Sequence, residues 1–458
     1  MTEALANRIQ RFETVDALTE FAAGVTYDDL PAEAICAAQI FIMDSLAVGL
    51  AGVTYGATAQ ALAAATNWGE GSTRVIGRPG VELARPSAAF VNGMQIHALE
   101  WDGLHELSVV IALCAPMGAM SAEVGDRQIS GKALIVALIV AVEVAVFFGG
   151  DTSASPRFFR PSAAGGMGAA AGMARLRGYD QQKMIHTLGL AHAQTAGTMQ
   201  AHWEGSMALP MQIGNAARMA HLCVDMVDAG MTGPIDFVDG QFGYFKLFES
   251  GGRIDKLLGE LGKPFKITQM AHKPYPAGRA TQAALTMIRQ LRAEHAFEAQ
   301  AITRITIDVP PLIMMLVGRP ASDDMSPSYA RLCLRFIVPL MLLHDDIDPR
   351  HFDASRFSDP QIQRLGQRVH IRDDGNQDKN ALGPQTMEIE FADGRRLRSA
   401  CPAPLGSPDN PLTRQQREDK VRRCFALGES AVEAEPFIDK CNALATLEDV
   451  GELLDHLC

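Results

Sequence analysis

The sequence predicts a mainly α protein, in which a large all-helical domain carries an inserted, smaller α+β lid domain. From about residue 15 to 265, apolar residues recur at three- and four-residue spacing, which is the period of a helix. Further along, short stretches alternate and are rich in β-branched residues, and after Pro402 the helical period returns. We therefore expect a helical domain of residues 1–268 completed by a tail of residues 403–458, with the lid at residues 269–402.

The helices expected in the first domain are separated by Gly, Pro and Asn, which end helices. Many of their residues are small, so the helix axes can approach closely. They span residues 32–52, 86–100, 109–123, 131–149, 162–178, 181–197 and 214–230. Their number exceeds that of a four-helix bundle.

The helix of residues 131–149 is apolar almost throughout and needs to be distinguished from a membrane span. A span needs about 20 apolar residues. This helix offers 133–148, and Glu143 lies inside that run. We expect a buried helix at the centre of the first domain and no membrane partner.

The lid is expected to contain four strands and two helices. The strands span residues 301–309, 368–372, 387–391 and 395–399, and the helices span residues 281–296 and 326–344. The last two strands are close enough in sequence to form a hairpin through a turn at Gly394. Three helices are expected in the tail, at residues 413–426, 431–441 and 447–458.

Composition excludes several classes of protein. The 458 residues carry a net charge of -12 without a long basic run, which argues against a nucleic-acid partner. The eight cysteines have no C-x-x-C spacing, so they are expected to be reduced, packed thiols. Residues 1–14 mix acidic and basic side chains and do not resemble a secretory signal. We expect a cytoplasmic location.

A cluster of polar residues follows the apolar stretch that ends at Ile96. It contains His97, Glu100, Asp102 and His105 within nine residues. Such side chains are costly to bury without partners, so their clustering indicates a polar pocket suited to proton transfer. A His and a Glu three residues apart on a helix also fit a purely structural pair.

Several short motifs occur in an order and at spacings that resemble the MmgE/PrpD family. The matching stretches are Asp44–Gly52, Asn92–Asp102, Gly165–Ala170, Gly214–Ala217, Thr232–Pro234 and Lys273–Pro276. The family includes 2-methylcitrate dehydratases, cis-aconitate decarboxylases and an iminodisuccinate epimerase. The resemblance implies a helical domain with an α+β lid, an active-site crevice between them, and a homodimer.

The chain departs from the family pattern at positions that carry chemistry. A family Asp-Asp-Thr stretch is shortened here, a His has become Arg160, and further Lys and His residues are absent. The affected positions are Gly103, Leu104, Arg160, Leu209, Gln212 and Gln282. Dehydration and decarboxylation both need an intact general acid, whereas epimerisation needs two groups that exchange one proton on opposite faces of a carbon.

The remaining residues supply a site for a small polycarboxylate. His105, oriented by Glu100 or Asp102, would act from the helical side, and Lys273 or Tyr275 from the lid side. Arg160 and Arg279 would clamp carboxylates, with His97 and Ser162 also expected to contact the substrate. This set favours an epimerase of the iminodisuccinate type. A dehydratase, a decarboxylase and a non-catalytic binding protein on the same fold are the alternatives.

No cofactor or metal is expected. The glycines of Gly165–Gly168 do not follow a strand and lack a phosphate-binding Lys, so they indicate close helix packing. His97, Glu100 and His105 are possible metal ligands, but the H-E-x-x-H pattern is absent. Arg160 could instead pair with Asp151 in a surface turn. His202 precedes a glycine-bounded loop and could face the crevice.

Overall fold

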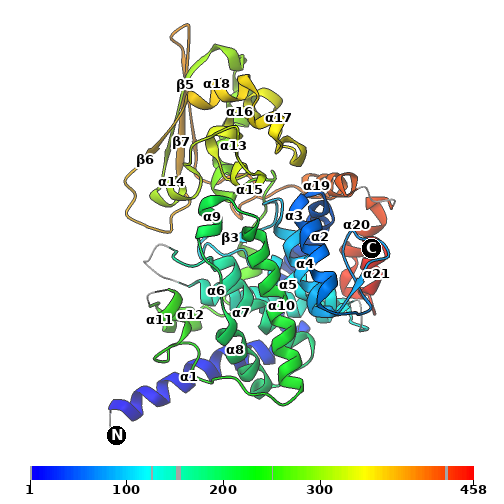
Figure 1. The fold of residues 1–458 in the computed structure, drawn as a ribbon. Helices are drawn as coiled ribbons and strands as arrows, with labels where there is room; N and C mark the ends of the chain where they lie inside the picture. Colours follow the sequence, from blue (N-terminus) through cyan, green and yellow to red (C-terminus); the bar gives the residue numbers. More distant parts are fainter. Residues whose placement is uncertain (1–2, 125–126, 151–155, 250, 429–431) are drawn as a thin grey trace.

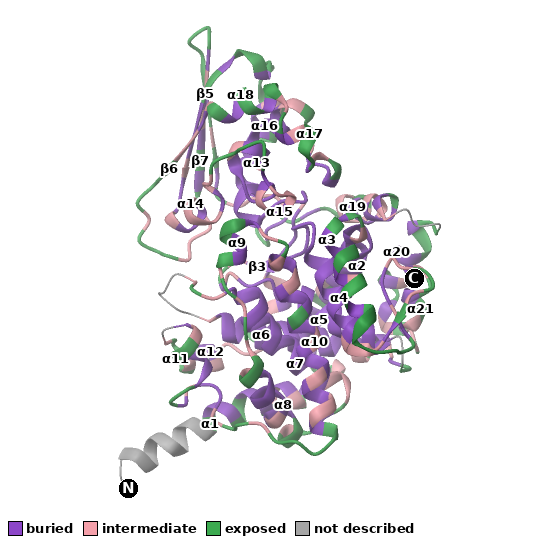
Figure 2. Cartoon of the chain, viewed as in Figure 1, coloured by how far each residue is buried: buried purple, intermediate pink, exposed green. Residues whose placement is uncertain are grey.

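The computed structural model describes residues 3–124, 127–150, 156–249, 251–428 and 432–458, with side chains from residue 13 onward. The described chain is mainly α, as predicted, and its small amount of sheet is concentrated in the C-terminal half (Figure 1). Figure 2 shows that the helices in the middle of the molecule are buried along most of their length.

The N-terminal helices pack into several layers. α6 lies along α7, and α10 packs against α4, α5 and α7. The helices are α1 (Glu3–Gly24), α2 (Ala32–Ala51), α3 (Gly56–Ala65), α4 (Arg85–His97), α5 (Cys114–Val124), α6 (Gly131–Gly149), α7 (Arg160–Leu176), α8 (Gln181–Gln194), α9 (Gln200–Glu204), α10 (Ala208–Asp228), α11 (Tyr244–Phe248) and α12 (Ile254–Gly259). A short ladder joins β1 (Thr73–Arg74) to β2 (Glu82–Leu83).

Helix α6 is part of the core. Among the described residues, two segments are long and apolar enough to cross a membrane by length and composition, Ala32–Thr54 and Gly131–Gly149. Within an 18-residue window of each, 72% and 89% of the residues respectively are buried inside the protein. A Cβ added to Gly168 on α7 would lie 2.3 Å from the carbonyl oxygen of Ala141 on α6. Close packing explains the glycines of α7, as the sequence predicted.

The C-terminal half contains a four-stranded sheet with the order β6-β5-β7-β8. β5 runs parallel to β6 and antiparallel to β7, and β7 and β8 form the expected hairpin. α13 packs on β7 and β8, and α16 on β6. The elements are α13 (Gln282–Glu294), β5 (Ile302–Val309), α14 (Pro311–Val317), α15 (Pro327–Ala330), α16 (Leu334–His344), α17 (Ala354–Phe357), α18 (Pro360–Gln367), β6 (Val369–Asp373), β7 (Gln385–Phe391) and β8 (Arg396–Cys401).

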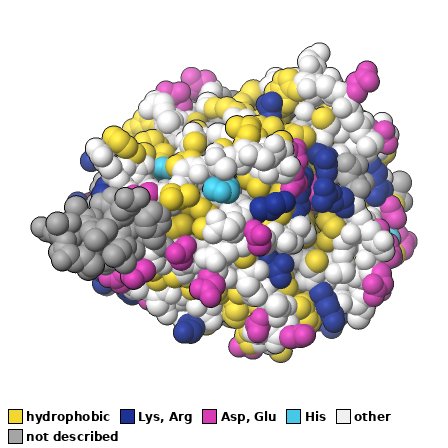
Figure 3. Space-filling view, turned by 90° about the horizontal axis from the view of Figure 1, so that it is seen from below, with side chains coloured by type: hydrophobic (Ala, Val, Ile, Leu, Met, Phe, Trp, Pro, Cys, Tyr) yellow, Lys and Arg dark blue, Asp and Glu magenta, His cyan; other side chains and the backbone are white. Residues whose placement is uncertain are grey.

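The C-terminal tail returns to the N-terminal helices. Its helices are α19 (Arg414–Leu427), α20 (Ala434–Asn442) and α21 (Gly451–Leu454). α19 and α20 both pack against α2. All eight cysteines are free thiols, and six of them are buried. The face seen from below carries both acidic and basic side chains among apolar ones (Figure 3).

Several expected helices have different bounds, among them α10, which begins at Ala208 and not at residue 214. The helix expected at residues 326–344 is split into α15 and α16 by a turn, which periodicity does not reveal because the turn contains neither Gly nor Pro. The helix expected at 109–123 begins only at Cys114, since the preceding residues turn back to pair Val110 with His105. Within 447–458 only α21 forms, after a single 3-10 helix at Leu444–Thr446.

Candidate active site

The polar cluster lies in the turn after α4 and meets a distant part of the chain there. Within this turn Glu100 has a left-handed backbone, with a φ of 53°. The turn leads into β3 (Leu104–His105), which pairs antiparallel with β4 (Met270–Ala271). Asp102 and Lys273 each lie two residues beyond the Leu104–Ala271 pair of this ladder, and their side chains approach to 3.6 Å. The pairing of β3 with β4 thus brings the Asn92–Asp102 motif next to the Lys273–Pro276 motif.

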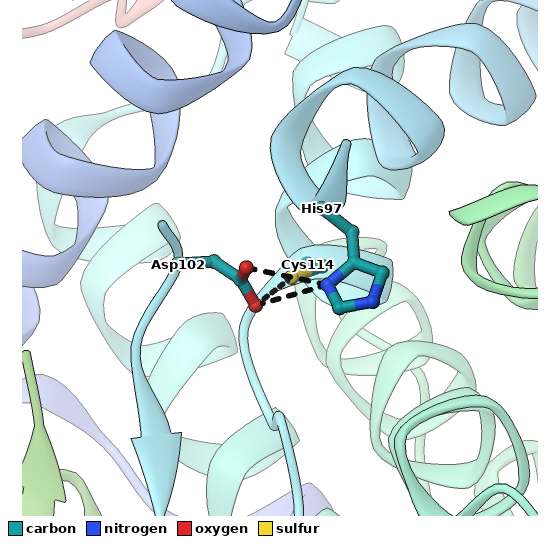
Figure 4. Close-up of side chains that lie close together, drawn as sticks. All are labelled: His97, Asp102 and Cys114. Carbon is teal, nitrogen blue, oxygen red and sulfur yellow. Dashed lines mark hydrogen bonds and ion pairs between the residues drawn. The ribbon is translucent and has the colours of Figure 1, made fainter. Parts of the chain in front are cut away.

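Buried ionisable side chains form one network at this junction. Lys273 Nζ lies 3.0 Å from Glu100 Oε2 and 3.6 Å from Asp102 Oδ1. His97 Nδ1 lies 3.2 Å from Asp102 Oδ1, and its Nε2 lies 3.4 Å from Glu100 Oε1. Cys114 Sγ donates to Asp102 Oδ2 at 2.8 Å. Figure 4 shows the thiol and the imidazole converging on the Asp102 carboxylate.

The two carboxyl groups and the lysine of the network are held in their charged forms. Burial alone would lower the pKa values of Lys273 and His97, but Asp102 and Glu100 outweigh burial, so both pKa values are raised. Burial would raise the pKa values of the two carboxyl groups, but Lys273 and His97 outweigh it and hold both below their ordinary values. At neutral pH both carboxylates and the Lys273 ammonium are therefore charged, and Lys273 carries a proton that it can donate.

His97, Asp102 and Cys114 also resemble a metal site, since their ligand atoms all lie within 4.8 Å of one another. A metal would require the thiolate form of Cys114. Burial and the Asp102 charge raise the pKa of this thiol well above its ordinary value. The Lys273 ammonium already supplies the positive charge that faces Asp102. The residues fit a proton-bearing network better than a metal site.

A pocket opens beside the network. Its charged and polar lining comprises Glu100, Arg160, His202, Lys273 and Arg279. The apolar wall includes Leu104, Val109, Ile111, Leu316, Val317 and Leu332. Four of the site residues predicted from the sequence thus come together here. An apolar pocket with a few convergent charged groups is typical of a small-molecule site.

The two arginines of the pocket differ in their partners. Arg160 donates from Nε and Nη2 to the buried carboxylate of Glu249, at 2.8 and 2.7 Å. Its suggested partner Asp151 lies outside the described residues. Arg279 donates from Nε to Glu106 at 2.8 Å, but its buried Nη2 has no hydrogen-bond partner among the described residues. Nη2 of Arg279 is therefore a hydrogen-bond donor that a ligand could use, whereas Nε and Nη2 of Arg160 are already bound to Glu249.

His105 lies in a different cavity from Lys273, so the structure corrects the expectation that they share one crevice. Successive side chains on a strand point to opposite faces. Leu104 accordingly lines the pocket of Lys273, while His105 lines a cavity on the other side of β3. His105 Nδ1 lies 2.8 Å from Ser108 Oγ and Nε2 lies 3.2 Å from Gln269 Oε1. Burial lowers the pKa of His105 to about 4.

Tyr275 and Ser162 also lie away from the pocket lining. Tyr275 lines a third cavity, where its hydroxyl accepts a hydrogen bond from Arg289 at 3.0 Å. Ser162 Oγ lies 3.0 Å from the carbonyl oxygens of Ala196 and Gln212, and so joins α7 to neighbouring backbone. Neither of these two residues, which the sequence places in the site, lines the cavity that holds Lys273.

Two parts of this chain match the domains of one known protein family. Residues 16–256 match the MmgE/PrpD N-terminal domain and residues 275–444 match the MmgE/PrpD C-terminal domain. The chain belongs to the MmgE/PrpD family. Cis-aconitate decarboxylase of Homo sapiens is 26% identical over 397 residues, covering 83% of this chain and 81% of that protein. Cis-aconitate decarboxylase of Aspergillus terreus is 23% identical over 487 residues, covering 100% and 98% respectively.

Within this MmgE/PrpD chain, two of the substituted family positions have structural roles. Gln212 Oε1 accepts from the backbone of Thr198 at 2.6 Å, and Gln282 Nε2 donates to two backbone carbonyls. Leu209 is buried. These side chains stabilise the surroundings of the pocket without lining it.

The sequence interpretation missed two groups near the network. Arg331 is buried against the rings of Tyr55 and Phe352, and its Nε and Nη1 have no hydrogen-bond partner among the described residues. Lys420 on α19 forms a buried ion pair with Asp44 at 2.7 Å. The Asp44 motif was the only available signal for this pair, because nothing in the local sequence distinguishes Lys420 from a surface lysine.

Proposed function

We propose that this chain is a cofactor-independent lyase that removes a carboxylate as CO2 from a small unsaturated polycarboxylate and protonates the product. The pocket supports this through one feature above others. Lys273, a proton-bearing acid, lines the same cavity as Arg279, whose buried Nη2 has no partner among the described residues. An anion-binding donor beside a general acid is what such a reaction requires. The similarity to cis-aconitate decarboxylases supports the same reaction class.

In the proposed reaction one carboxylate leaves the substrate as CO2, and one proton replaces it on the carbon skeleton. Arg279 would hold a substrate carboxylate that remains in the product. When another carboxylate leaves as CO2, the electron pair of the broken C–C bond delocalises through the alkene onto a remaining carboxylate. The Lys273 ammonium then donates its proton to carbon and is reprotonated from water. Glu100, 3.0 Å from Nζ, and Asp102 keep the ammonium charged until that step.

The arrangement favours a lyase over the epimerase expected from the sequence. Epimerisation needs proton-transferring groups on two faces of one carbon. Lys273 and Glu100 contact each other and so approach a substrate from one side. The two other predicted acid–base groups, His105 and Tyr275, line separate cavities.

We also propose that residues 269–402 act as a lid over a helical domain of residues 1–268 and 403–458. The pocket lining supports this division, since Glu100, Arg160 and His202 come from the first part and Lys273 and Arg279 from the second. Movement of the lid away from the helical domain would admit the substrate, and its return would exclude water. The homodimer and the cytoplasmic location implied earlier stay predictions.

Reaction in deuterated water distinguishes the candidate functions. We expect cis-aconitate, or a related unsaturated polycarboxylate, to release CO2 and to gain one deuterium in the product, followed by proton NMR. Loss of water from 2-methylcitrate would support a dehydratase. Deuterium exchange with inversion and no loss of CO2 would support an epimerase. Binding of all of these acids without turnover would support a non-catalytic protein. Lys273→Met is the control and should abolish turnover.

A further inference from the structure

His202 is an unassigned polar residue of the pocket. It lies on the short helix α9 and lines the same cavity as Glu100 and Lys273. Its Nδ1 lies 3.2 Å from Nη2 of Arg319, in the loop between α14 and α15. The same Nη2 donates to the Leu316 carbonyl at 3.0 Å. The imidazole is therefore held from the C-terminal half of the chain.

The contact with Arg319 determines the tautomer of His202. A guanidinium has hydrogen-bond donors and no acceptor. Nδ1 of His202 must therefore accept, which leaves the ring proton on Nε2. Burial, reinforced by the Arg319 charge, lowers the pKa of His202 to about 4, so the ring is neutral at neutral pH. Nε2–H has no hydrogen-bond partner among the described residues and is available to a ligand.

The backbone around α9 fixes this orientation. Gly205, directly after α9, has a φ of 64°, and a Cβ there would lie 2.4 Å from the Cβ of Tyr329 on α15. Ser326 donates to the Gly205 carbonyl. The Arg319 guanidinium stacks on the Tyr329 ring, 4.7 Å from its centroid. The helix, the arginine and the ring thus form one packed unit with few alternative arrangements.

We propose that His202 is a catalytic residue whose Nε2–H binds the substrate carboxylate on which negative charge develops, and that Arg319 is the positioning residue that fixes this tautomer. The inference rests on the proposed lyase function. As CO2 leaves, charge moves onto the remaining carboxylate. A preorganised donor strengthens its hydrogen bond at that moment and lowers the barrier. A neutral imidazole serves as donor and not as base, because its other nitrogen is bound to Arg319.

The charged groups that act on His202 allow a sharp test of the tautomer. Arg319 and His97 lower its pKa, and Glu100 raises it. In Arg319→Met the forced acceptor role of Nδ1 is lost, so both tautomers become populated and the pKa moves up toward its ordinary value. Arg319→Lys keeps a cationic donor and should restore the Nε2–H form.

Nitrogen-15 NMR of histidine-labelled protein measures this directly, with His202→Gln identifying the signals. We expect wild-type His202 to show only the Nε2–H tautomer and no titration between about pH 5.5 and 8. Arg319→Met should show signals of both tautomers and a pKa higher than that of wild-type His202. An Nδ1–H tautomer in the wild type, or unchanged signals in Arg319→Met, would overturn the positioning role. These signals do not depend on turnover, so they remain informative if the lyase proposal fails.

Kinetics test the catalytic role. His202→Leu should lower kcat by about 10²- to 10³-fold with little change in KM, which is the usual cost of one such donor. His202→Gln keeps an N–H donor and should retain most of kcat. Thermal melting identifies variants that fail to fold. A folded His202→Leu with kcat within about threefold of wild type would refute the role.

Discussion

Lys420 connects the C-terminal tail to the turn that carries the polar network. Its Nζ lies 2.7 Å from Asp44 Oδ1 on α2 and donates to the carbonyl of Trp101 at 2.7 Å. Trp101 lies within the turn, and its indole donates to the carbonyl of Pro274 at 3.1 Å. Lys420→Met would therefore leave a buried carboxylate without its cation and remove a donor that holds the turn.

The expected loss of stability follows from the burial of this pair. Removing one partner of a buried ion pair costs about 3–5 kcal/mol. Asp44 can limit this cost by taking up a proton. From its reference pKa of 3.8, protonation at pH 7 costs about 4 kcal/mol, and at pH 5 it costs about 1.6 kcal/mol. Burial raises the pKa of Asp44, so this carboxyl takes up a proton more readily in the folded chain than in the unfolded one. We expect a loss of about 4 kcal/mol at pH 7 and about 2 kcal/mol at pH 5.

Urea unfolding of wild type, Lys420→Met, Asp44→Asn and the double variant measures this coupling at both pH values. The double variant should be more stable than the sum of the single effects predicts, by about 2 kcal/mol or more. Lys440→Met is a matched control, since it removes a partly exposed ion pair with Glu452 and should cost less than about 1 kcal/mol. Additive effects, or equal losses at pH 5 and pH 7, would refute the buried pair.

Three further predictions concern other parts of the chain. Burial raises the pKa of Glu143 to about 7, so its contribution to stability is full below pH 4.5 and is lost as pH rises through 7. Glu143→Gln should therefore reduce the dependence of the free energy of unfolding on pH in this range. An unchanged pH dependence would contradict the prediction. Arg279→Lys should weaken binding of an unreactive tricarboxylate about 10- to 100-fold by calorimetry, whereas equal weakening in Arg289→Lys would point to an indirect effect. Dialysis against a chelator should leave activity unchanged, because the Asp102 carboxylate already faces the Lys273 ammonium; activity restored only by zinc would contradict this.

Much of the fold could be predicted because local sequence patterns report burial. The apolar run with Glu143 inside it predicted the buried helix α6, and alternation with Gly394 predicted the hairpin of β7 and β8. The split between α15 and α16 could not be predicted, since no residue in that turn breaks a helix by itself.

The candidate site was only half predictable. Clustering of Glu100, Asp102 and His105 indicated proton chemistry, but nothing in the sequence shows which face of β3 each side chain takes. Strand alternation turned His105 away from the pocket of Lys273. His202 had no family motif to single it out, and its tautomer depends on Arg319, which lies far along the chain.

The sequence by itself determined the mainly α architecture, the family, and the residue types of the candidate site, because periodicity and motif order are properties of the chain. Tertiary structure alone decided which of those residues share a pocket. The pairing of β3 with β4 set Lys273 against Glu100 and Asp102, and thereby fixed their charges. Protonation depends on burial and on the charges that lie nearby in space, and the spacing of residues along the chain determines neither.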